Sequence, residues 1–163
     1  MWKPRIYLDT SVISYLDQQD APARMAETRL AWERIKQGMY EIFISDLVLE
    51  EMSRCEEEKL ARLTAFLNMI SYHVVEITDK VYDLAQVIID FDILKEKSRD
   101  DCNHIAAALI ADCDLILSWN FKHLVNIDTI KGVKVIATME GYKDLLIYPP
   151  SVLLEEDRHE ENN

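Results

Sequence analysis

The chain has 163 residues, which is enough for one domain with a sizeable core, and 49% of them are hydrophobic, as in an ordinary globular protein. A formal net charge of −12 argues against broad affinity for nucleic acid, because phosphate binding usually depends on a basic face. No apolar run is long enough to span a membrane, and the first residues lack the apolar core of a signal peptide. We therefore expect a single cytoplasmic domain with no membrane partner.

The composition also argues against two kinds of site. The three cysteines, Cys55, Cys102 and Cys113, form no C-x-x-C pair, which disfavours both a disulfide framework and a thiolate zinc site. We expect them to be buried, reduced thiols. Only three glycines occur, so the sequence has no glycine-rich loop that could cradle a phosphate.

Short apolar strands alternate with helical stretches along the chain. In chain order, the sequence predicts a strand at Arg5–Leu8, a helix at 22–37, a strand at Glu41–Ser45, helices at 46–54 and 56–70, a strand at His73–Ile77, helices at 79–91 and 102–111, and strands at Leu115–Ser118 and Val133–Ala137. Gly38 is expected to stop the first helix, Thr78 or Asp79 to cap a later one, and Ser98–Asp101 to form a capping box.

This alternation predicts a three-layer α/β/α domain over residues 1–148. The strands are apolar on both faces, which favours a mainly parallel sheet of about five strands with helices on both sides. The stretch Tyr148-Pro149-Pro150 is expected to end the regular structure, and the acidic tail over residues 149–163 is expected to be disordered.

Four polar residues stand where such a sheet would gather them. Asp9 follows the first strand, Glu51 lies on the helix after the second, Asp101 begins a later helix, and Asn120 follows the strand at 115–118. Sites in parallel sheets form beyond the carboxyl ends of the strands. Taken singly, Asp9 and Asp101 could be helix caps, and Glu51 could be a solvated helix acid. Taken together, they indicate a site.

Clustered carboxylates repel one another, and some would bind a proton unless a cation were present. A site with oxygen ligands only, without His or Cys, favours Mg²⁺ or Mn²⁺ over zinc. Such an ion can activate a water molecule and stabilise a departing oxygen. The chemistry that the sequence indicates is therefore metal-assisted hydrolysis of a phosphodiester.

Three stretches resemble the PIN-domain family, and specifically the VapC-type ribonuclease toxins. IYLDTSVI resembles the opening strand of the family, with its acid at Asp9. FISDLVLEEM resembles the second motif, in which the acid lies six residues after Ser45, at Glu51. DCNHIAAALIADCDLILSWN resembles the family's D-x-x-H-I-A-x-A helix and the strand after it, with the acid at Asp101, three residues before His104.

The resemblance implies a PIN fold and a Mg²⁺ or Mn²⁺ site held by Asp9, Glu51 and Asp101. It also implies endoribonuclease activity on an RNA substrate that leaves 5′-phosphate and 3′-hydroxyl ends, homodimerisation, and inhibition by an antitoxin protein. The family's fourth position often carries Asp, but here it falls on Asn120, which would complete the ligand shell or hold the attacking water. The loss of one charge leaves a weakened or inert RNA- or protein-binding module of the same fold as the alternative.

Several neighbours of these residues are candidates for supporting the site. The hydroxyls of Thr10 and Ser11 are expected to hydrogen-bond the first acid or to reach the metal's ligand shell, with ordinary helix capping as the alternative. His123 is expected to supplement the site beside Asn120. His104 is interpreted as a structural histidine rather than a general base. Trp119 could stack a base, although a core position is favoured for it.

Two further functional alternatives concern charge and phosphate. The basic run KEKSR, with Lys95, Lys97 and Arg99, could touch RNA phosphates, although a solvated loop is favoured. An aspartyl phosphatase is disfavoured because the D-x-D-x-T pattern of those enzymes has a second acid at the position where this chain has Ser11.

Overall fold

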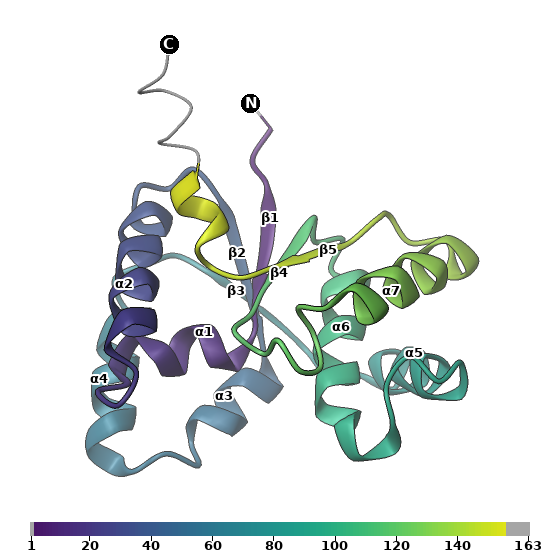
Figure 1. Cartoon of the computed structure of the whole chain (residues 1–163), viewed down its shortest axis with the longest axis horizontal. Coiled ribbons are helices and arrows are strands. Elements are labelled where there is room, and N and C mark those ends of the chain that lie inside the picture. Colours follow the sequence, from purple (N-terminus) through teal and green to yellow (C-terminus); the bar gives the residue numbers. More distant parts are fainter. Residues whose placement is uncertain (1, 156–163) are drawn as a thin grey trace.

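The computed structural model describes residues 2–155, and its centre is a five-stranded sheet in the order β3-β2-β1-β4-β5, with every pair of strands parallel (Figure 1). The strands are β1 Arg5–Leu8, β2 Glu41–Ser45, β3 His73–Val75, β4 Leu115–Leu117 and β5 Leu146–Tyr148. The helices are α1 Thr10–Ser14, α2 Pro22–Lys36, α3 Asp46–Met52, α4 Glu57–Leu67, α5 Asp79–Asp90, α6 Arg99–Ile110 and α7 Ile127–Glu140, with 3₁₀ turns η1 Tyr15–Asp17 and η2 Glu96–Ser98. The predicted α/β class is confirmed.

Helices cover both faces of the sheet, with α2 and α4 on one side and α5, α6 and α7 on the other (Figure 1). The central strand β1 is therefore enclosed, and Ile6, Tyr7 and Leu8 have no exposed surface. Its neighbours are β2 and β4, so that Tyr7 pairs with Phe43 on one side and with Ile116 on the other. Residues that follow β1, β2 and β4 must consequently emerge at one edge of the sheet.

Small side chains allow α6 to pack closely against the sheet. Its central residues, Ile105–Leu109, are all buried, because a run of alanines brings the helix backbone near the strands. The capping box predicted before this helix is wrong: Ser98 occupies the N-cap position, but its side chain makes no capping hydrogen bond. Asp101, in the first turn of α6, is therefore not part of a capping box.

The strand predicted at Val133–Ala137 is wrong, because this stretch lies inside α7. Its β-branched residues suggest a strand, but its buried positions, Thr129, Val133, Ile136 and Ala137, follow the helical period. Asn126 caps the helix by accepting a hydrogen bond from the Thr129 N–H at 2.9 Å, and Gly141 ends it with a left-handed φ of 78°. The fifth strand is instead Leu146–Tyr148, which pairs with β4.

The residues after Tyr148 do not become irregular at once. The Val152 N–H donates to the Pro149 carbonyl at 3.0 Å, and Leu153 is buried against the core. The predicted disorder from residue 149 is therefore wrong for residues 149–155, and residues 156–163 lie outside the described part of the chain. Within residues 2–155, no helix combines the length and apolar character that crossing a membrane requires.

The cysteines within residues 2–155 are free thiols, as predicted. Cys102 and Cys113 are buried, and burial raises the pKa of each to about 12, so both remain protonated at neutral pH. Cys55 is partly exposed.

Candidate active site at the carboxyl edge of the sheet

Asp9 lies directly after β1 and is almost completely buried, with 5% of its surface exposed. It occupies the N-cap position of α1, but its carboxylate makes no capping hydrogen bond. Instead, Oδ2 accepts hydrogen bonds from the hydroxyls of Ser11 at 2.7 Å and Ser118 at 2.8 Å. A simple cap therefore does not account for this carboxylate, which is held by two hydroxyls from residues that follow β1 and β4.

Glu51 reaches the same place from α3. Its Oε1 accepts a hydrogen bond from Thr10 Oγ1 at 3.0 Å and lies 2.5 Å from His104 Nε2. The same nitrogen of His104 lies 3.7 Å from Asp9 Oδ1, so one imidazole contacts both acids. The neighbouring Glu50 points outward and pairs with Arg54 at 3.2 Å on the surface.

His104 is fully buried and uses both ring nitrogens. Nδ1 lies 2.7 Å from the Tyr7 hydroxyl, which lies 2.7 Å from the Ser45 hydroxyl. In the protonated imidazole both ring nitrogens donate: Nε2 donates to Glu51, and Nδ1 donates to the Tyr7 hydroxyl, which in turn donates to Ser45 Oγ. The sequence prediction of a hydrogen-bonded structural histidine did not anticipate that His104 would also join two candidate site acids.

The pKa directions of this pair follow from their contacts. Burial lowers the pKa of His104, but the hydrogen bond to Glu51 and the charges of Asp9, Glu51 and Asp101 outweigh it and raise the pKa above its ordinary value. Burial raises the pKa of Glu51, but the hydrogen bonds from His104 and Thr10 outweigh it and lower that pKa. Both shifts favour an imidazolium beside a carboxylate.

Asp101 faces this cluster from the first turn of α6. Burial, followed by the negative charge of Asp9, raises the pKa of Asp101 to about 6. Its Oδ1 accepts a hydrogen bond from the Asn120 side chain at 3.4 Å. The positive charge of His104 opposes the shift without cancelling it, so the carboxylates at this edge of the sheet repel one another.

Asn120 is fixed in place by a tight set of hydrogen bonds. Its backbone N–H donates to Ser118 Oγ at 2.9 Å, and its side-chain Oδ1 accepts from the His123 N–H at 3.0 Å. Its Nδ2 faces Asp101, as described above. The structure thus brings Asn120 to the predicted site, with both ends of its amide engaged by neighbouring protein groups.

The residue types suit a hard divalent cation, but their arrangement is not a ready-made coordination shell. The carboxylate oxygens of Asp9, Glu51 and Asp101 are ligands that Mg²⁺ and Mn²⁺ prefer. The raised pKa of Asp101 comes first from burial and then from the negative charge of Asp9, and a cation would oppose both effects. Across residues 2–155, however, no three His, Cys, Asp or Glu side chains are placed so that they could hold one metal ion. Oε1 of Glu51 is instead hydrogen-bonded to His104 Nε2.

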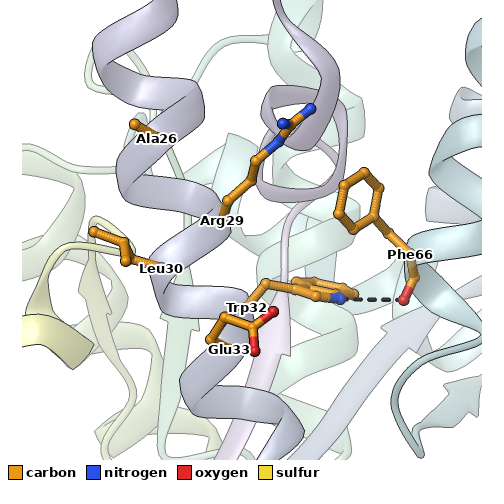
Figure 2. A pocket seen from close by; sticks show the side chains of 6 residues that line it. All are labelled: Ala26, Arg29, Leu30, Trp32, Glu33 and Phe66. Carbon is orange, nitrogen blue, oxygen red and sulfur yellow. Dashed lines mark hydrogen bonds between the residues drawn. The ribbon is translucent and has the colours of Figure 1, made fainter.

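A separate groove of about 430 Å³ lies between α2 and α4 (Figure 2). Apolar side chains dominate it, and the Trp32 indole N–H at its floor donates to the Phe66 carbonyl at 3.1 Å. Its lining residues are Ala26, Arg29, Leu30, Trp32, Glu33 and Phe66. None of the predicted site residues lines it, so this groove is separate from the candidate site.

The comparison with solved structures agrees with this architecture. A chain in the crystal structure of VapBC2 from Rickettsia felis bound to a DNA fragment from their promoter matches with a TM-score of 0.56 and 13% sequence identity. The match covers 88% of the present chain and 96% of that chain. The fold is PIN-like. At this identity the likeness concerns the fold, and the resemblance seen in the sequence is confirmed at that level.

No protein-family model matches the chain, and no curated protein sequence matches it. The roles of individual residues therefore rest on their geometry. Ser118 and Tyr7 belong to the site but were not predicted. Ser118 could have been found, because it ends the apolar stretch at Leu115–Leu117, next to the strand that carries Asp9.

Proposed function

We propose that the protein is a divalent-metal-dependent endoribonuclease and the toxin of a toxin–antitoxin pair. The observation that carries this proposal is the grouping of Asp9, Glu51 and Asp101 at the carboxyl edge of a PIN-like sheet. Burial, followed by the negative charge of Asp9, raises the pKa of Asp101 there to about 6. Acids held this close favour a bound cation. The VapBC2 likeness supports the toxin–antitoxin assignment.

Asp9, Glu51 and Asp101 are the residues that would hold Mg²⁺ or Mn²⁺. When bound, such an ion supplies Lewis acidity toward a phosphodiester and an activated water. Ser11 and Ser118 fix the Asp9 carboxylate by hydrogen bonds, and His104 does the same for Glu51. The expected products carry 5′-phosphate and 3′-hydroxyl ends.

The neighbouring residues have supporting roles in this proposal. Thr10 orients Glu51 through a hydrogen bond of 3.0 Å. Asn120 holds Asp101, and its own position is fixed by the backbone N–H of His123. The imidazole of His123 lies close enough to Asp101 to lower the pKa of that carboxyl, which opposes the effect of the neighbouring acids.

The partners of the proposed enzyme are an RNA substrate, an antitoxin protein and a second copy of the chain. The name of the structural neighbour joins two components, VapB and VapC, and supports the antitoxin. Homodimerisation and a cytoplasmic location remain predictions. Light scattering of the purified protein would test the first.

Two pairs of adjacent acids allow a matched test of the proposal. Glu51→Gln and Asp101→Asn should each reduce cleavage of a mixed-sequence single-stranded RNA at least 100-fold in Mn²⁺, because each removes a ligand charge. Their neighbours, Glu50→Gln and Asp100→Asn, lose the same charge outside the cluster and should cleave like the wild type. EDTA should abolish cleavage by all active forms.

Equal activity in Glu51→Gln and Glu50→Gln would show that the cluster is not the catalytic site. Cleavage that persists in EDTA would exclude the metal dependence. Labelling of the fragments at their 5′ ends shows which end carries the phosphate. If the 5′ end carries it, as proposed, labelling succeeds only after the fragments are treated with a phosphatase.

A weakened or inert binding module of the same fold is the second candidate. It is favoured by Asn120, which takes the place of an acid and whose amide is already hydrogen-bonded at both ends, and by the engagement of Glu51 with His104. Titration calorimetry with Mn²⁺ separates the two candidates. The enzyme should show saturable heat that Asp101→Asn reduces, whereas the inert module should show none.

A further inference from the structure

The chain leaves β4 through Trp119, Asn120 and Phe121, and the two aromatic side chains have different environments. Trp119 is buried, and its indole N–H donates to Thr28 Oγ1 at 2.9 Å, so its face is not open to a ligand. Phe121 is 43% exposed, and its ring centroid lies 6.2 Å from that of Trp119. The aromatic ring that is exposed beside the site is therefore that of Phe121, and not that of Trp119, which the sequence analysis considered for stacking a base.

An arginine lies over this aromatic cluster. The Cζ of Arg24, on α2, is 5.1 Å from the ring centroid of Phe121, 5.4 Å from that of Trp119 and 5.9 Å from that of Tyr15. These distances are typical of cation–π contacts, which hold the guanidinium without consuming its N–H donors. Among residues 2–155, no carboxylate pairs with Arg24, although the chain carries a net charge of −12.

The cluster is joined directly to the candidate site. The backbone N–H of Trp119 donates to Ser11 Oγ at 2.9 Å, and that hydroxyl donates to the Asp9 carboxylate at 2.7 Å. Phe121 follows Asn120, whose side chain contacts Asp101. A cation and an exposed aromatic face thus lie at the rim of the carboxylate cluster.

We infer that Arg24 and Phe121 form a nucleotide-binding rim, in which Phe121 stacks a base of single-stranded RNA and Arg24 binds an adjacent phosphate. The inference rests on the proposed function for its substrate class. Every base has a π-face, so one exposed phenylalanine suits single strands of any sequence. The guanidinium has donors in the fork geometry that matches a phosphate, and it supplies a local positive charge on an acidic protein.

The test measures binding in EDTA, so that cleavage does not interfere. A single-stranded hexaribonucleotide that contains 2-aminopurine is titrated with wild-type protein, and stacking on Phe121 should quench its fluorescence. Phe121→Leu, which retains an apolar side chain without the flat ring, should lose the quenching and weaken binding about tenfold. Phe121→Trp should restore both. Phe91→Leu, a change at another exposed phenylalanine, at the end of α5, should have no effect.

Arg24 is tested by the salt dependence of the same titration. Arg24→Gln should weaken binding and reduce the slope of log Kd against log salt by about one, because one phosphate contact is lost. Lys36 lies on the same helix, and its ammonium group is already paired with Glu33 at 3.0 Å. Lys36→Gln should therefore leave the slope unchanged.

The outcomes separate this inference from the proposed function. Absence of quenching by the wild type, or equal behaviour of Phe121→Leu and Phe91→Leu, would overturn the rim and leave the aromatic surface to a protein partner. Cleavage with an unchanged KM in Phe121→Leu would also overturn it while the enzyme assignment stands. Quenching that depends on Phe121 in a protein that cleaves no RNA would support the rim and reject the nuclease.

Discussion

His104 keeps two acids of the candidate site from meeting directly. Its Nε2 contacts both Glu51 and Asp9, and its Nδ1 contacts the Tyr7 hydroxyl. The imidazole is buried, so its position is set by these partners rather than by water. At the scale of single residues, the geometry of the acids therefore depends on Tyr7, a side chain two residues before Asp9 that points away from solvent.

Tyr7→Phe tests this dependence. The substitution removes one hydroxyl, leaves the ring in place, and deprives both His104 Nδ1 and Ser45 Oγ of a buried partner. We expect the free energy of unfolding in urea to fall by about 1–3 kcal/mol. We also expect RNA cleavage to fall about tenfold, because Glu51 is held less firmly. Tyr82→Phe, at a tyrosine that is 48% exposed, is the control. Equal stability of the two variants would show that the network contributes little.

Asn120→Asp tests the charge that the sequence lacks. The new carboxylate would lie beside Asp101, so it should raise the pKa of Asp101 further and lower the stability of the metal-free protein at pH 7.5. The same charge should strengthen Mn²⁺ binding about tenfold in titration calorimetry. Asn68→Asp adds the same charge at an exposed position after α4 and should change neither quantity. Unchanged Mn²⁺ affinity in Asn120→Asp would place Asn120 outside the metal's surroundings.

At the scale of elements, α7 is held against the loop after α5 by a close approach. A Cβ added at Gly132 would meet both γ carbons of Ile93 at 2.7 Å. Those carbons branch from the Ile93 Cβ, so they cannot move away without a change of rotamer. The glycine here serves packing, since its helical backbone conformation does not itself require one.

Gly132→Ala should therefore destabilise the protein by about 1–3 kcal/mol, although alanine is the better helix former. In an Ile93→Ala background, where the obstructing carbons are gone, the same substitution should instead stabilise the protein by about 1 kcal/mol. Urea unfolding of the four proteins in this cycle measures both effects. A stabilising Gly132→Ala in the wild-type background would mean that Ile93 yields without cost.

The sequence predicts elements best where one signal dominates. The strands at Arg5–Leu8 and Glu41–Ser45 are confirmed, because apolar runs bounded by polar residues have few other interpretations. The stretch Val133–Ala137 was mispredicted because its β-branched residues outweighed its helical spacing. The strand at Leu146–Tyr148 is three residues long, and its pairing with β4 is a tertiary contact that local composition does not encode.

The site could be predicted only in part for the same reason. Asp9, Glu51 and Asp101 could be proposed together, because parallel strands bring their carboxyl ends to one edge. The contact of Tyr7 with His104 joins residues 97 positions apart, and that of Ser118 with Asp9 joins residues 109 apart. The pairing of such residues has no local signal, although the end of an apolar strand marks the position of Ser118. The sequence identified the acids and Ser11, which donates to Asp9, but not Tyr7 or Ser118.

At the scale of the whole molecule, the acidic composition and the acidic site both make additional negative charge unfavourable in the folded protein. A net charge of −12 disfavours further negative charge, and the crowded carboxylates concentrate this repulsion at one edge of the sheet. The folded protein should therefore be less stable when Asp101 is ionised than when it is protonated. A divalent cation should recover that stability.

The pH dependence follows from the pKa of Asp101, which is about 6 in the folded protein and about 3.9 in an unfolded chain. Between these values the folded state binds more protons, so the contribution of Asp101 to the free energy of unfolding decreases as pH rises from about 4 to about 6. Asp101→Asn should consequently have a higher Tm than the wild type at pH 7.5, and this difference should disappear near pH 4. Asp100→Asn, which loses the same charge on the surface, should show no such difference.

Mn²⁺ should reverse the ranking at pH 7.5. It should raise the Tm of the wild type, where it relieves the repulsion among three carboxylates, and should raise that of Asp101→Asn much less. Thermal unfolding with and without the ion measures both variants under identical conditions. If the wild type and Asp101→Asn unfold at the same temperature at pH 7.5 and neither responds to Mn²⁺, the carboxylates are not under electrostatic strain. Such a result would mean that this edge of the sheet binds no divalent cation.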